Sequence, residues 1–159
     1  MSSVTTGMTV VTKEAVVRGE ILAADSYKIC LLRANASLGR SYGPSSYLKY
    51  ADITAATSDE VASGAGYTTG GATLASYASG PNNATPTVIT GTGAWLTWAT
   101  VTWTSATFTA SAAAIYDNTH ANKLVLGWYD FGGDKTVTAG TLTLTMPTAA
   151  AGTAVFCLN

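Results

Sequence analysis

Few side chains in this sequence could take part in acid–base or nucleophilic chemistry. The only histidine, His120, lies in a polar stretch typical of a loop, so a catalytic triad would need a distant serine or cysteine to reach it. Asp59 and Glu60 are adjacent, and in a strand they would point to opposite faces, unlike the paired carboxylates of a glycosidase. We expect no enzyme here. A hydrolase that uses Asp59, Asp130 or His120 is kept as the least favoured of three hypotheses, and the other two are given below.

Metal and cofactor sites find no better support. One histidine and two distant cysteines fall short of a zinc ligand set. Asp130 and Asp134 could offer oxygens to calcium, but their spacing fits no calcium loop, and aspartates that bond their own backbone in turns are the simpler interpretation. The glycines from Gly64 to Gly71 precede no Lys-Ser or Lys-Thr and open no helix, so they indicate an edge strand or a bulge rather than a phosphate loop. No metal and no cofactor is expected.

The cysteines and tryptophans leave two alternatives each. Cys30 and Cys157 lie in apolar, strand-like surroundings, which favours buried free thiols; a disulfide would need the first and last strands to be neighbours. Trp95, Trp98 and Trp103 could line a sugar-binding face, but tryptophans in β-rich domains more often fill the core or a subunit interface.

Hydrophobic alternation predicts many short strands. The clearest is Tyr27–Leu32, whose odd-numbered residues lie on one face and even-numbered residues on the other. Leu124–Phe131 and Thr136–Met146 are predicted to flank a tight turn at Gly132-Gly133-Asp134, where glycine adopts positive φ without steric cost. A further turn is predicted at or near Ser105.

Turn signals about every 8–12 residues, without a convincing amphipathic helix, predict an all-β fold. Our first choice is a jelly-roll-like β-sandwich and our second an up-and-down β-barrel. The sandwich domain is expected over residues 25–159, with Thr153–Leu158 as its terminal strand, after an extended N-terminal arm over residues 1–24. Within the arm, Thr12–Leu22 could form a short helix, although two β-branched valines and a glycine disfavour it; an extended arm or an edge strand is as well supported.

The composition narrows the range of partners. Charged residues make up only 11% of the chain, against roughly 25% in an average soluble domain. A neutral, hydroxyl-rich surface suits packing against protein better than steering a charged ligand. The net charge of −1 and the absence of a basic cluster argue against nucleic acid. No apolar run approaches the ~18 residues of a membrane span, and the N-terminus lacks the features of a signal peptide, so we expect a protein made in a cytoplasm with no membrane partner.

Residues 34–50 form a long polar loop that carries three tyrosines. Loops of this length are usually functional or part of an interface. The tyrosines either contact a partner or pack the loop onto the domain, and both interpretations stay open. The arm and this loop supply our candidate contact residues, which are Val10, Val11, Val16, Arg18, Arg40, Tyr42, Tyr47 and Tyr50.

Three strings carry a family resemblance: DEVASGAGYTTGGATL (Asp59–Leu74), VTWTSATFTASAAAIYDNT (Val101–Thr119) and LVLGWYDFGGDKTVTAGTLTLTMP (Leu124–Pro147). They resemble a family of small virion proteins of tailed bacteriophages, in which a GxGYTxGG element precedes a VTW strand and an LLGYxDFGxDK hairpin. The matching residues are Gly64, Gly66, Tyr67, Thr68, Gly70, Gly71, Val101, Thr102, Trp103, Ile115, Tyr116, Asp117, Leu126, Gly127, Asp130, Phe131, Gly132, Asp134 and Lys135. Trp128 stands where the pattern has tyrosine. The resemblance covers about Ala51–Pro147 and leaves the loop at 34–50 and the C-terminal strand unmatched.

The resemblance implies a virion structural protein without enzymatic activity, assembled in the host cytoplasm. The leading hypothesis is a capsid decoration (cement) protein that binds and stabilises the head shell. Its expected partners are the major capsid protein and further copies of itself, as a trimer if it sits on a local three-fold axis. The second hypothesis is a tail, fibre or baseplate component, in which the tryptophan-rich segment and the long loop would contact a host receptor or a glycan.

Overall fold

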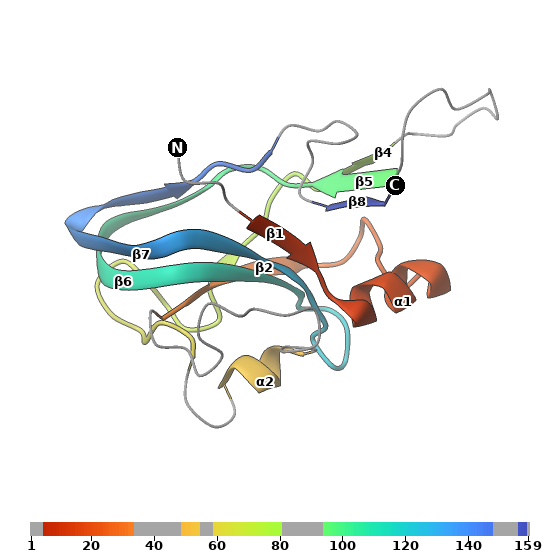
Figure 1. The fold of residues 1–159 in the computed structure, drawn as a ribbon, viewed down its shortest axis with the longest axis horizontal. Helices are drawn as coiled ribbons and strands as arrows, with labels where there is room; N and C mark the ends of the chain where they lie inside the picture. The colour runs from red at the N-terminus through yellow and green to blue at the C-terminus, as the bar shows by residue number, and fades with distance from the viewer. Residues whose placement is uncertain (1–4, 34–48, 55–58, 81–93, 148–155, 159) are drawn as a thin grey trace.

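The computed structural model of this chain describes residues 5–33, 49–54, 59–80, 94–147 and 156–158. These residues build a mostly β structure with a five-stranded antiparallel sheet, in the order β1-β7-β6-β2-β3, and a three-stranded sheet, in the order β4-β5-β8 (Figure 1). The elements are β1 (Thr5–Met8), α1 (Val10–Arg18), β2 (Tyr27–Leu32), α2 (Tyr50–Thr54), β3 (Ala72–Thr73), β4 (Ala78–Gly80), β5 (Ala94–Thr97), β6 (Val101–Asp117), β7 (Val125–Leu144) and β8 (Phe156–Leu158). The predicted β class is confirmed, and the strands that the structure describes form no closed barrel.

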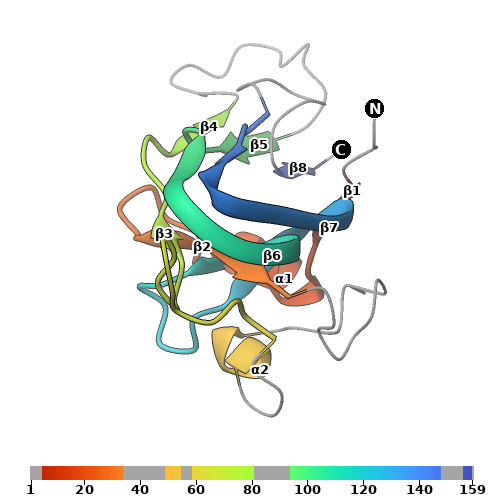
Figure 2. The same cartoon turned by 90° about the vertical axis from the view of Figure 1, so that its left-hand side faces the viewer.

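Strands β6 and β7 are the longest elements and form the centre of the fold. They pair antiparallel from Tyr116 and Val125 at one end to Val101 and Leu144 at the other. Figure 2 shows the two strands curving together along the molecule. The chain reverses in the polar loop 118–124, as its composition predicted.

The predicted turn at Gly132-Gly133-Asp134 is wrong. Both glycines have positive φ, 69° for Gly132 and 148° for Gly133, but β7 continues through them. Ser111 on β6 stands opposite four residues of β7, Phe131–Asp134, so the glycines form an enlarged β-bulge. Asp130 Oδ1 accepts a hydrogen bond from the Gly132 amide at 2.8 Å and fixes its start. A positive φ is compatible with a bulge as well as with a turn. Because β7 pairs with β6 both before and after the two glycines, the structure here is a bulge.

The predicted turn at Ser105 is wrong for a related reason. Ser105 has φ 51°, and the register between β6 and β7 shifts between Trp103 and Ala106. The strand absorbs this irregularity and continues to Asp117. A single residue in the left-handed region therefore bends the strand without ending it.

Strand β2 is buried on both faces, and its predicted alternation is confirmed. Tyr27, Ile29 and Leu31 belong to the larger core, together with residues of β6, β7 and the segment around Trp98. Cys30 and Leu32 belong to a smaller core on the other face, which Ile53 of α2 closes. Cys30 is a free, fully buried thiol, as predicted, and burial raises its pKa.

The extended arm predicted for residues 1–24 is wrong for the residues that the structure describes. Thr5–Met8 form an edge strand that pairs with Asp130–Gly127 of β7, and Val10–Arg18 form helix α1. Thr9 caps the helix, because its side-chain oxygen accepts a hydrogen bond from the Thr12 amide at 3.2 Å. Gly19 ends it in the left-handed conformation, with φ 70°. These two caps outweigh the low helix propensity of the valines.

The remaining strand predictions divide by position. The glycine-flanked edge strand is confirmed, because β3 lies at the edge of the main sheet directly after Gly70 and Gly71. The terminal strand is confirmed over Phe156–Leu158, which pairs with β5. The sequence also predicts a short strand over residues 87–90, and these residues lie outside the described ranges.

Candidate functional site

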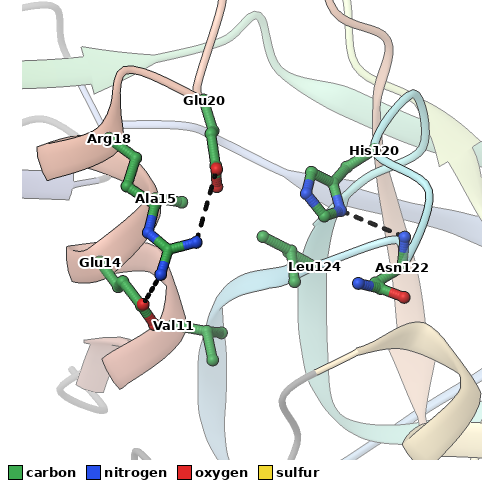
Figure 3. A pocket seen from close by; sticks show the side chains of 8 residues that line it. All are labelled: Val11, Glu14, Ala15, Arg18, Glu20, His120, Asn122 and Leu124. Carbon is green, nitrogen blue, oxygen red and sulfur yellow. Dashed lines mark hydrogen bonds and ion pairs between the residues drawn. The ribbon is translucent and has the colours of Figure 1, made fainter.

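A surface pocket of about 240 Å³ lies between α1 and the loop that joins β6 to β7 (Figure 3). It brings together two of the predicted contact residues, Val11 and Arg18. Its lining residues are Val11, Glu14, Ala15, Arg18, Glu20, His120, Asn122 and Leu124.

Helix α1 is fastened to the sheet by two buried threonines. Thr9 Oγ1 donates to the carbonyl of Val125 at 2.6 Å, and Thr12 Oγ1 donates to the carbonyl of Leu126 at 2.8 Å. The Thr9 amide also donates to the Leu126 carbonyl at 3.0 Å. Buried hydrogen bonds of this kind fix a side of the helix, so the other side is presented to solvent in a defined orientation.

Replacing Thr12 with valine tests this attachment. Valine keeps the shape of threonine but leaves the carbonyl of Leu126 without its hydroxyl donor, so we expect the free energy of unfolding to fall by about 1–3 kcal/mol. Hydrogen exchange should show faster opening of the α1 amides than of the β6 amides. Thr141→Val is the control substitution. Thr141 is exposed on β7, so this variant should change the free energy of unfolding by less than about 0.5 kcal/mol. Equal effects at both positions would contradict the attachment.

Charges of both signs meet at the pocket. The Arg18 guanidinium lies 2.5 Å from Glu14 Oε1 and 3.8 Å from Glu20 Oε1, and all three side chains are substantially exposed. On the opposite wall, His120 Nδ1 accepts a hydrogen bond from the Asn122 amide at 3.1 Å. Figure 3 shows the guanidinium and the imidazole on facing sides, with Leu124 between them and Val11 below. The pocket is therefore lined by both charged and apolar side chains.

The loop that carries His120 is ordered by a buried aspartate. Asp117 Oδ1 accepts hydrogen bonds from the amides of Thr119 and His120, at 2.8 and 3.0 Å. Burial raises the pKa of the Asp117 carboxyl, although these two amide donors oppose the rise. Asp117, which the family resemblance includes, thus acts as a turn-forming residue that positions one wall of the pocket.

The predicted contact residues fall into three groups. Val10, Val11, Val16 and Arg18 all lie on α1, and two of them, Val11 and Arg18, line the pocket. Tyr50 opens α2, where its ring stacks on Tyr116 with 4.5 Å between ring centroids. The last group, Arg40, Tyr42 and Tyr47, lies outside the described residues.

Sequence reasoning missed the role of Glu60. Its carboxylate is buried and accepts three hydrogen bonds, from the Tyr50 hydroxyl at 2.5 Å, the Tyr67 hydroxyl at 2.6 Å and the Gly70 amide at 2.7 Å. Burial, with the neighbouring Glu60, raises the pKa of both tyrosines, so both hydroxyls keep the protons that they donate. Glu60 therefore ties α2 to the glycine-rich segment. Its position seven residues before Tyr67 was the only sequence signal.

The tryptophans divide between core and partial exposure. Trp98 and Trp103 are buried in the larger core, where Trp98 contacts Tyr27, Tyr77 and Phe156. Trp95 is half-buried and covers Gly80, since a Cβ at that glycine would lie 2.5 Å from its ring. Buried indoles cannot stack on a sugar, so the glycan-binding interpretation loses two of its three residues.

No family model, curated protein or solved structure matches this chain. The phage resemblance is therefore carried by the quoted motifs alone. Several of those motif residues have structural roles here: Tyr67 binds Glu60, Asp117 orders a loop, and Gly132 forms a bulge.

Two further observations concern the described ranges alone. They contain no group of three or more His, Cys, Asp or Glu side chains that could hold a metal ion. They also contain no helix with the length and apolar character needed to cross a membrane. Of the three residues named for a hydrolase, Asp59 is buried, Asp130 starts the β7 bulge and His120 lies at the pocket.

Proposed function

We propose that this protein is a virion structural protein that decorates and stabilises the head shell of a tailed bacteriophage. The phage role rests on the quoted motifs, and the observation that supports a binding surface is α1: a helix anchored by buried threonines, with predicted contact residues beside a pocket of mixed polarity. Rigid presentation lowers the entropic cost of binding, and repetition over a shell turns weak contacts into a stable layer. The major capsid protein is the proposed partner, and no enzymatic activity is part of the proposal.

The jelly-roll-like sandwich belongs to this proposal. Phe156 of β8 and the neighbouring Trp98 pack in the same core as Tyr27 and Leu31 of the main sheet. A second sheet of a sandwich would make this contact with the first.

The structure changes how the proposal should be tested. Deleting residues 2–20 would remove β1, the edge strand paired with β7, together with the buried hydroxyls of Thr9 and Thr12. Such a deletion would weaken folding and binding together. Substitutions at the pocket separate the two.

The double variant Val11→Ser, Arg18→Glu is expected to bind heads assembled without the protein at least about tenfold more weakly, a loss of about 1.4 kcal/mol. It removes an apolar wall and reverses a charge at the pocket, while the buried attachment of α1 is kept. Occupancy is measured by co-sedimentation with heads, and the temperature at which heads open is followed in parallel. Thr145→Asp, a charge added at an exposed position after β7, is the matched control and should bind as the wild type does.

Unchanged occupancy of the double variant would exclude this surface of α1 as the shell contact. Wild-type protein that binds isolated tails but not heads would overturn the head assignment in favour of a tail component. Thr145→Asp should unfold at nearly the wild-type temperature, and the double variant should stay folded but unfold at a somewhat lower temperature, because it loses the ion pairs of Arg18 with Glu14 and Glu20.

A further inference from the structure

The solvent side of α1 carries an exposed apolar ridge, formed by Val10 and Val17. Their exposed fractions are 57% and 88%. They are seven residues apart, about two helical turns, so they lie on the same face. Thr12 and Ala15 are buried on the opposite side. An exposed valine pair adds little to the stability of a short helix, so this ridge is a candidate contact surface.

Opposite charges flank the ridge. Lys13 and Glu14 are both exposed, and consecutive helical residues are about 100° apart, so they lie on either side of the valines. If two copies of α1 lay parallel about a two-fold axis, Lys13 of each copy would face Glu14 of the other. Val10 would meet Val10, and Val17 would meet Val17. An antiparallel pair would instead set lysine against lysine and glutamate against glutamate.

We propose that α1 packs in parallel against α1 of a second copy of this chain. Lys13 meets an opposite charge on the second copy only in that orientation. Glu14 keeps its bond to Arg18 through Oε1, and its second oxygen faces Lys13 of the second copy.

The size of the contact fixes where it operates. A helix of nine residues buries much less than the ~1,200 Å² of a stable interface, so free copies associate weakly. The inference rests on the proposed function in this respect, because copies on a shell are held close enough for a weak contact to form. A two-fold contact joins copies in pairs. The contact through α1 would therefore form a dimer and not the trimer expected from the sequence.

Cysteine cross-linking at high protein concentration tests the pairing without a shell. Val17→Cys lies on the two-fold axis and should form intermolecular disulfides at least about tenfold faster than exposed Thr145→Cys, because a disulfide needs Cβ atoms within about 4 Å. Lys13→Cys and Glu14→Cys should each cross-link slowly alone and rapidly when mixed. Wild-type protein, oxidised in the same way, gives the background of the native cysteines.

Each outcome decides a separate point. Val17→Cys reacting no faster than Thr145→Cys would overturn the pairing. Lys13→Cys linking to itself as fast as to Glu14→Cys would overturn the parallel orientation. Head binding by wild-type protein is measured separately. If the protein binds heads but the cross-links do not form, the proposed function stands without the pairing. If the cross-links form but the protein does not bind heads, the pairing stands without the proposed function.

Discussion

Replacing Gly71 with alanine is expected to lower the free energy of unfolding by more than about 3 kcal/mol, or to prevent folding altogether. Gly71 has φ 69°, and a Cβ built there would lie 1.9 Å from the carbonyl oxygen of Ile29 and 2.7 Å from the Cα of Cys30. These are backbone atoms of β2, which is hydrogen-bonded on both sides by β3 and β6. The strand cannot move away without breaking one of these ladders.

Gly19→Ala is the matched control for that variant. Gly19 has nearly the same φ, 70°, but no atom lies within 4 Å of the position its Cβ would take. Its substitution therefore reports only the conformational cost of the left-handed region, about 1–2 kcal/mol. Urea unfolding followed by tryptophan fluorescence compares the two variants. Equal losses would mean that Gly71 does not approach β2 as described.

Local sequence predicted β2 well and β7 badly, for a physical reason. Tyr27–Leu32 is recognisable as a strand because its two faces are buried in separate cores, which requires apolar residues at nearly every position. At Gly132 and Gly133 the same positive φ fits a turn or a bulge, and the local residues do not distinguish them. The choice depends on pairing with residues of β6 that lie about 20 positions earlier in the chain.

The candidate site could be predicted only in part. The contact residues proposed within residues 10–18 lie together on α1. Thr9 and Gly19 are residue types typical of helix caps, but the β-branched valines between them disfavour a helix. The opposite wall of the pocket comes from loop 118–124, more than a hundred residues later. The pairing of β1 with β7 and the hydrogen bonds of Thr9 and Thr12 to Val125 and Leu126 bring the two walls together, and no local pattern encodes these contacts.

Glu60 shows the same limit for burial. A glutamate beside an aspartate in a polar stretch looks solvated, and charged residues are seldom fully buried. Here two tyrosine hydroxyls and an amide converge on it from α2 and from the segment before β3. The carboxylate is tolerated because its hydrogen bonds replace water.

Replacing Glu60 with alanine is accordingly expected to destabilise the protein by about 3–5 kcal/mol. The variant leaves the hydroxyls of Tyr50 and Tyr67 and the amide of Gly70 without their acceptor. Chemical denaturation measures the loss. Hydrogen exchange should show α2 opening first, because Tyr50 would then keep its stacking on Tyr116, its amide bond to the Lys123 carbonyl and the Lys123 ammonium over its ring, but lose its link to Glu60.

Glu60→Gln is the graded control, and it keeps the experiment informative if Glu60→Ala fails to fold. A glutamine oxygen in the Oε1 position still accepts from Tyr67 and Gly70, and its amide can donate to the Tyr50 oxygen, since a hydroxyl also accepts. We expect a loss less than half that of alanine. Tyr50→Phe should cost about 1–2 kcal/mol, and much less in the Glu60→Ala background, because both changes remove the bond between the Tyr50 hydroxyl and Glu60. Additive losses would show that Tyr50 and Glu60 do not interact, and the link between α2 and the glycine-rich segment would have to be made elsewhere.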